Sequence, residues 1–182
     1  MQSDGDIKAV LRTIFNSAEF AVAAGQKFKR PFDFMVSALR ALDAQVTIEP
    51  ADGGQPGAGT RRNPIFQSLT QLGHVPFMWS TPDGYPDKTA AWLNTNGMLG
   101  RWNFGLALMS GITGISINSQ ALVGSTNSIE ELVDRAADVL LGAPLTDQPR
   151  SILIDFAKAT PEKARLPGVA ALIIGSPQFQ VR

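Results

Sequence analysis

The stretch SIEELVDRAADVLLG, which covers residues 128–142, decides the class of fold. Ser128 and Glu131 form a capping box, in which each side chain satisfies an N–H group of the other at the start of a helix. Gly142 suits the end of that helix. Between them the apolar residues recur at helical spacing: Ile129, Leu132, Val133, Ala136, Ala137 and Leu140. The stretch therefore predicts an amphipathic helix that buries one face in a hydrophobic core.

Helical periodicity continues on both sides of this stretch. Further helices are expected at residues 7–15, 31–42, 64–72, 90–93, 98–110, 148–159 and 160–175, the last one interrupted at 166–168. Ser3 or Asp4 would cap the first helix. Residues 111–127 fit either a strand or a buried loop. The pattern predicts an all-α fold, an irregular bundle of about six to eight helices in one domain spanning residues 1–182, whose last helix packs against the first two.

Two segments interrupt the helical pattern. Residues 51–62 are rich in Gly and Pro and cannot offset the entropy of ordering by burial, so we expect a flexible insert. Residues 74–87 contain three prolines, which exclude a continuous helix. They also carry Phe77, Trp79 and Tyr85, which are too apolar for a solvated linker. This segment therefore predicts a long ordered loop, rich in Pro and aromatic residues, that packs onto the helices.

The composition excludes several classes of function. Lys and Arg together number 16, and so do Asp and Glu, so no excess of positive charge attracts nucleic acid. The chain has no cysteine, which excludes disulfides and cysteine nucleophiles. No segment holds the roughly 18 consecutive apolar residues that a membrane span needs. The N-terminus lacks the basic and apolar parts of a signal peptide, so no export signal is expected in this chain.

His74 is the only histidine, so any general-base scheme of the Ser-His-Asp kind must use it as a catalytic residue. It follows Gly73, at a predicted helix end, where an imidazole would equally serve as a cap or as a surface residue. With one histidine and no cysteine, the sequence nearly excludes a zinc site.

The loop sequence PDGYPD, residues 82–87, offers two carboxylates and a phenol. Oxygen ligands of this kind suit Ca²⁺, which makes Asp83 and Asp87 candidate metal ligands. With Tyr85, the same two residues are also candidate catalytic groups. Their spacing is not that of an EF-hand, and Asp-Gly and Tyr-Pro equally form ordinary turns. The sequence requires no cofactor, and Ca²⁺ is the one that it could hold.

Aromatic residues gather in the same part of the sequence. Trp79, Tyr85 and Trp92 could form a platform for a small molecule or a sugar. Arg101 and Asn103 are polar residues that would join this candidate ligand-binding site.

The alternative is that these aromatic residues belong to the core. Trp102 lies on an apolar helical stripe, which favours that interpretation. Arg101 and Arg40 would then pair with Asp83 or Asp87 and lock the loop, without any catalytic role.

Three stretches, taken in order, carry a family resemblance. They are residues 31–42 (PFDFMVSALRAL), residues 72–104 with LGHVPF, PDGYPD and LGRWNF, and residues 170–180 (AALIIGSPQFQ). Together they resemble the C-terminal part of the bacterial family known as domain of unknown function 1800. The resemblance covers nearly the whole chain apart from the insert at 51–62. His74 stands where we expect Gln in many relatives, so it is a poor candidate for a shared catalytic residue.

The resemblance implies a longer parent protein, of which this chain would be a C-terminal fragment or the product of an internal start at Met1. Members of the family are often exported or associated with the cell envelope, which implies a periplasmic or secreted protein. The family has no agreed activity, so the resemblance supplies relatives and no mechanism.

We therefore expect an uncharacterised helical binding or assembly module of a larger, envelope-associated protein. Its partner would be the N-terminal part of the parent protein or another envelope protein, and a small-molecule ligand is compatible with the aromatic residues. One alternative is a hydrolase of a small ester, lactone or glycoside, assisted by Ca²⁺, in which Asp83 and Asp87 act with His74 or Tyr85. Another alternative is an inactive folded fragment whose active groups lie elsewhere in the parent.

Overall fold

The computed structural model describes residues 5–47, 63–118 and 123–182. Within them the chain forms nine α-helices, two of which have only four residues: α1 (Ile7–Phe15), α2 (Ala18–Ala21), α3 (Pro31–Ala41), α5 (Pro64–Gln71), α6 (Thr89–Trp92), α7 (Thr95–Ser110), α9 (Ile129–Leu141), α10 (Asp147–Ala159) and α11 (Glu162–Gly175). A 3-10 helix, η1 (Gln178–Gln180), follows α11. The prediction of an all-α bundle is confirmed. Ser3, Asp4 and the insert at 51–62 lie outside the described residues.

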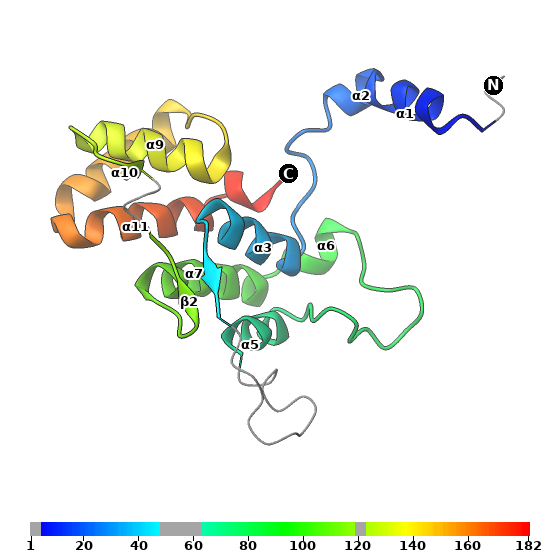
Figure 1. Cartoon of the computed structure of the whole chain (residues 1–182), viewed down its shortest axis with the longest axis horizontal. Coiled ribbons are helices and arrows are strands. Elements are labelled where there is room, and N and C mark those ends of the chain that lie inside the picture. Colours follow the sequence, from blue (N-terminus) through cyan, green and yellow to red (C-terminus); the bar gives the residue numbers. More distant parts are fainter. Residues whose placement is uncertain (1–4, 48–62, 119–122) are drawn as a thin grey trace.

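The core forms around α11, which packs against α7, α9 and α10 (Figure 1). Most of the buried side chains come from these helices and from α3 and η1, among them Phe34, Ala38, Phe104, Leu108, Val133, Ala137, Ala157, Val169, Ile174 and Phe179. Gly105 allows α7 to approach α11 closely, because a Cβ atom there would lie 3.2 Å from Ile174 Cγ2. A small residue at this crossing therefore sets the distance between the two helices.

The expectation that the last helix packs against the first two is wrong for α1. Together α1 and α2 form an arm that projects away from the other helices (Figure 1). No residue of α1 is buried, although one of its faces is apolar: Ile7, Val10, Leu11, Ile14 and Phe15. The carboxylate of Asp6 caps the helix by accepting from the Lys8 N–H at 2.9 Å. Local capping, and not burial among the described residues, therefore defines this helix.

Proline does not interrupt α11, so the expected break at residues 166–168 is wrong. The helix runs through Pro167, which removes one backbone hydrogen bond and normally costs about 3 kcal/mol in a helix interior. Side chains on both sides of the proline are buried against neighbouring helices: Leu166, Val169, Ala170, Ile173 and Ile174. Their burial offsets the lost bond.

The capping box of α9 forms with one change of partner. Ser128 Oγ accepts from the Glu131 N–H at 3.0 Å, as predicted. The Glu131 carboxylate accepts from the Asn127 N–H at 2.7 Å, instead of from the N–H of Ser128. Gly142 ends the helix in the left-handed conformation with φ 67°, which confirms the predicted C-terminus.

α7 turns a different face to the core from the one expected. Its buried residues are Arg101, Phe104, Gly105 and Leu108. Trp102 is 48% exposed, and its Nε1–H donates to the Gly175 carbonyl oxygen at 3.0 Å. Because apolar residues occur on all sides of α7, their spacing alone does not select the buried face.

The residues between α5 and α6 form neither helix nor strand, which confirms the predicted loop. Farther along the chain, the described part of the open segment 111–127 contains a short strand, β2 (Ile115–Ser116), which pairs antiparallel with β1 (Gln45–Val46). Across the described ranges we find no helix with the length and apolar character of a membrane span. The expected absence of such a span in the sequence and this finding agree.

Candidate functional site

Three rings from the loop and one from the last residue of α6 contact one another, and we call them the aromatic cluster: His74, Trp79, Tyr85 and Trp92. The centroid of the Tyr85 ring lies 4.4 Å from that of His74 and 4.7 Å from that of Trp79. The His74 and Trp92 centroids are 5.0 Å apart. Three predicted ligand-binding residues therefore meet, but His74 and Trp92 are buried, so these rings pack on one another. Their binding of a small molecule stays a prediction.

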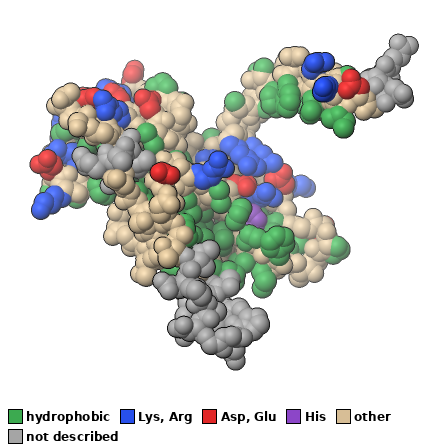
Figure 2. Space-filling view, in the orientation of Figure 1, with side chains coloured by type: hydrophobic (Ala, Val, Ile, Leu, Met, Phe, Trp, Pro, Cys, Tyr) green, Lys and Arg blue, Asp and Glu red, His purple; other side chains and the backbone are tan. Residues whose placement is uncertain are grey.

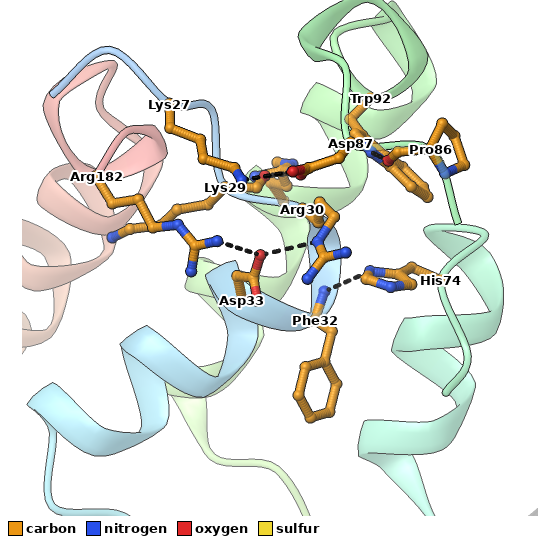
Figure 3. A network of polar contacts seen from close by, with 11 residues as sticks. Lys27, Lys29, Arg30, Phe32, Asp33, His74, Pro86, Asp87, Trp92 and Arg182 are labelled. Carbon is orange, nitrogen blue, oxygen red and sulfur yellow. Dashed lines mark hydrogen bonds and ion pairs between the residues drawn. The ribbon is translucent and has the colours of Figure 1, made fainter. Parts of the chain in front are cut away.

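His74 caps a helix, although not the one at whose end it lies in the sequence. Its Nδ1 accepts from the Phe32 N–H at 3.2 Å, in the first turn of α3, where Arg30 makes no side-chain cap of its own (Figure 3). Burial, and then the positive charge of Arg30, lowers the pKa of the imidazole, so the ring is neutral near pH 7. A neutral ring with an occupied Nδ1 carries its proton on Nε2, and in this state it cannot act as a general base.

The two candidate carboxylates bind different donors. Asp83 accepts from the Trp79 Nε1–H at 3.2 Å and from the Thr81 hydroxyl, and these hydrogen bonds, Thr81 first, lower its pKa. Asp87 forms an ion pair with Lys27 at 2.6 Å, and the hydrogen bond from Lys27 lowers the pKa of that carboxyl. Within the described ranges, no three His, Asp or Glu side chains gather as a metal site would require. Calcium binding stays a prediction.

The remaining candidates serve the loop and the core. The Tyr85 hydroxyl donates to the Val75 carbonyl oxygen at 2.7 Å, which ties the two ends of the loop together. Asn103 is exposed on α7, and a binding role for it stays a prediction. The expected pairing of Arg101 with Asp83 or Asp87 is wrong, because Arg101 lies in the core.

Arg101 is fully buried, and its guanidinium forms hydrogen bonds with two residues that are distant in the sequence, Lys29 and Gln180. Its two terminal nitrogens donate to Gln180 Oε1 at 2.8 Å and to the Lys29 carbonyl oxygen at 2.7 Å. The guanidinium also lies over the rings of Phe28 and Phe34, 4.5 and 5.0 Å from their centroids. A charged side chain thus joins α7, the segment before α3 and η1.

Sequence reasoning missed a group of cations around this point, which we call the basic cluster: Lys27, Lys29, Arg30, Arg101 and Arg182. It forms because residues 27–29 pair antiparallel with residues 180–182, with the Lys29 N–H donating to the Gln180 carbonyl oxygen at 2.7 Å. Asp33 lies among these cations (Figure 3). The only local signal is the alternation of Lys and Phe at 27–29, and nothing in it indicates pairing with the C-terminus.

The loop also holds three consecutive apolar side chains in solvent, which we call the loop patch: Phe77, Met78 and Trp79. Phe77 is fully exposed, and its φ of 65° is in the left-handed region. For a bulky residue this backbone conformation is a genuine outlier. The sequence showed apolar residues here, but periodicity could not show that the fold leaves them uncovered.

The comparisons with known proteins give the family and no activity. A family model described as "Protein of unknown function (DUF1800)" matches residues 1–181, essentially the whole chain. None of the curated proteins compared with the chain matches it. None of the solved structures matches it either. The family match agrees with the resemblance carried by residues 31–42, 72–104 and 170–180, and the chain therefore belongs to the DUF1800 family.

Proposed function

We propose that this chain is a non-catalytic docking module, which binds another polypeptide through apolar side chains that its own fold leaves in solvent. The partner would be a further part of a longer family member or a separate envelope protein. The observation that carries the proposal is the conformation and exposure of Phe77.

Phe77 combines two unfavourable features that the fold does not relieve. A non-glycine residue in a sparsely populated backbone region costs about 1–3 kcal/mol, and the side chain of Phe77 is fully exposed. Such strain persists only where the surroundings impose it, and here the bonds of Tyr85 and Asp83 hold the loop. Aromatic side chains are frequent anchors of protein interfaces. Docking onto a partner would bury the Phe77 side chain that this strained backbone holds in solvent.

A second uncovered apolar surface lies on the arm. The apolar face of α1 is continuous along its whole length, and Figure 2 shows hydrophobic side chains along one side of the arm. An isolated helix of nine residues is marginal in water. Contact of this face with another polypeptide would bury it and stabilise the helix, which supports the same proposal.

The polar groups near the loop support docking better than hydrolysis. His74 Nδ1 is occupied by a backbone N–H, and the carboxylates of Asp83 and Asp87 bind separate donors. These bonds connect the loop to itself, to α3 and to Lys27. The same contacts therefore fix the position of the loop patch and do not assemble an acid–base pair.

Sedimentation velocity of the purified chain over roughly 1–100 µM tests the proposal, because a second copy is then the only polypeptide present. We expect association that increases with concentration. Phe77→Ser, and separately the double change Leu11→Ser with Ile14→Ser, should weaken it without unfolding the chain, since all three side chains are exposed. Ile152→Ser on α10, also exposed and apolar, is the matched control and should leave association unchanged.

Phe77→Gly separates strain from contact. Glycine adopts a positive φ without steric cost, so the free energy of unfolding should rise by about 1 kcal/mol while association weakens. A wild-type chain that stays monomeric throughout the range would contradict docking of one copy of the chain onto another. An association that Phe77→Ser and the α1 double change leave as strong as in the control would contradict it as well.

A further inference from the structure

Charge is unevenly distributed around the start of α3. The chain as a whole has 16 cationic and 16 acidic side chains. The basic cluster, however, brings five cations together with two carboxylates, Asp33 and Asp87. Asp87 forms its ion pair with Lys27, at 2.6 Å. Figure 2 shows Lys and Arg side chains gathered beside the single histidine, where the arm joins the other helices. Among these side chains, an excess of three positive charges remains.

The second carboxylate does not saturate the remaining cations. Asp33 uses one oxygen, Oδ2, for both Arg30 at 3.1 Å and Arg182 at 3.5 Å. Within the described residues Lys29 has no carboxylate partner, and its ammonium group lies 4.0 Å from the centroid of the Phe179 ring. Arg30, Arg182 and Lys29 therefore keep N–H donors that a bound anion could use.

Arg101 adds a positive charge from the core, beneath the surface that carries Lys29, Arg30 and Arg182. It is fully buried, hydrogen bonds to the Lys29 carbonyl oxygen, and its Nε has no hydrogen-bond partner in the described part of the chain. Burial lowers the pKa of Arg101 to about 10, so the side chain is still charged at pH 7. The pKa of Lys29 is lowered by burial and then by the charges of Arg182 and Arg101. Within the described residues, the side chains of Asp33 and Asp87 therefore do not balance the positive charge at this place.

We propose that Lys29, Arg30 and Arg182 bind a phosphate group, whose charge balances the excess left by the two carboxylates. A phosphate presents several oxygens and can accept from three side chains at once, whereas Asp33 already supplies a carboxylate oxygen to two of them. Figure 3 shows Arg30 and Arg182 on either side of Asp33, and Lys29 is close enough to Arg182 for that charge to lower its pKa. Arg101 acts on the ligand through its field and does not touch it.

Two sources share this chemistry, namely free phosphate and the phosphate of a lipid headgroup. The site is independent of the loop patch and of the apolar face of α1, so its test does not depend on the docking proposal. Charged side chains at an exposed site lose their attraction for an anion as salt rises. All arms of the experiment are therefore compared at one ionic strength.

The experiment measures binding of inorganic phosphate by calorimetry, and by thermal melting, with chloride and citrate at matched ionic strength as reference anions. We expect phosphate to raise the melting temperature by mass action more than either reference does. Lys29→Met, which keeps the packing on Phe179, and Arg182→Gln should each weaken phosphate binding about tenfold. Their matched controls, Lys163→Met on α11 and Arg12→Gln on α1, should bind as the wild type does.

Flotation with vesicles distinguishes the two sources. Binding to vesicles that contain phosphatidylglycerol, but not to pure phosphatidylcholine vesicles, assigns the phosphate to a lipid headgroup if Arg182→Gln abolishes it and Arg12→Gln does not. Binding of inorganic phosphate alone assigns a free ligand. The proposal is overturned if citrate stabilises as much as phosphate, or if Lys29→Met and Arg182→Gln bind phosphate as well as their controls while remaining folded by circular dichroism.

Discussion

At the scale of single residues, the chain uses polar side chains to hold distant segments together. Arg101 reaches from α7 to the carbonyl of Lys29 and to Gln180, and His74 reaches from the end of α5 to the first turn of α3. Neither role follows from the local sequence, because each partner lies far along the chain. The sequence identified His74 and Arg101 as notable residues, but it placed the capping role of His74 at the wrong helix and paired Arg101 with the wrong residues.

Because Arg101 is buried, the loss of stability on replacing it depends on how much of its volume the new side chain fills. Arg101→Met fills much of the space but leaves Gln180 Oε1 and the Lys29 carbonyl without their donor, so we expect a loss of about 2 kcal/mol in the free energy of unfolding. Arg101→Ala adds a cavity and should lose about 4 kcal/mol. Urea unfolding measures both, and Arg12→Met on the exposed arm is the control. If Arg101→Met is as stable as the wild type, desolvation of the charge outweighs its two hydrogen bonds.

His74 predicts a dependence of stability on pH. Its folded pKa lies below the ordinary value of about 6.5, because of burial and of the charges of Arg30 and Arg101, with Asp33 opposing them. The unfolded chain therefore binds more protons between the folded pKa and about 6.5, so stability should fall as the pH is lowered through this window. His74→Gln keeps an acceptor for the Phe32 N–H and should flatten the dependence. Denaturation midpoints from pH 5 to 8 check it, and an equal slope in both proteins would contradict it.

At the scale of elements, sequence reasoning succeeded where a helix has strong caps and one apolar face. The α9 segment has both, and its bounds and buried face were predicted correctly. The α1 segment has an equally clear apolar face, yet the fold leaves that face in solvent, since periodicity shows that a face is apolar and not what covers it. In α7 the buried face includes an arginine and a glycine, so hydrophobicity alone indicated the wrong side.

The crossing of α7 and α11 gives a prediction at this scale. A side chain at Gly105 would meet Ile174 Cγ2 at 3.2 Å and the Ala171 carbonyl oxygen at 3.5 Å, so Gly105→Val should force the helices apart. We expect a loss of about 2–3 kcal/mol in the free energy of unfolding. Ala107→Val, at an exposed position of the same helix, is the matched control and should change it by less than about 1 kcal/mol. Equal losses in the two variants would show that the close approach does not matter.

At the scale of the whole molecule, the candidate site depends on parts that are far apart in sequence. The basic cluster combines residues from 27–33, α7 and the C-terminus, and it exists only once these segments pair. Composition gave a balanced charge and therefore no sign of it. The aromatic cluster, by contrast, lies within one stretch of about twenty residues, and for that reason its members could be named beforehand.

The C-terminal pairing can be divided into its packing and its hydrogen bonds. Phe179 is buried against Phe34, with ring centroids 5.8 Å apart, so Phe179→Ala should lower the free energy of unfolding by about 3–4 kcal/mol. Deletion of residues 181–182 removes the two backbone hydrogen bonds between Lys27 and Arg182 and the ion pair between Arg182 and Asp33, and should cost about 1–2 kcal/mol. Urea unfolding separates the two. A larger loss on deletion than on Phe179→Ala would place the main stabilisation in the pairing and not in the ring.

The contact between Phe34 and Phe179 also sets an order of events during protein synthesis. A ribosome adds about 5 to 20 residues per second, so Phe179 is made roughly 7 to 30 seconds after Phe34. Throughout that interval the nascent α3 lacks the aromatic ring that covers it in the finished chain. Slower elongation would therefore prolong the time during which Phe179 does not yet cover this face of α3, and chaperones that hold apolar nascent segments would have that interval in which to bind it.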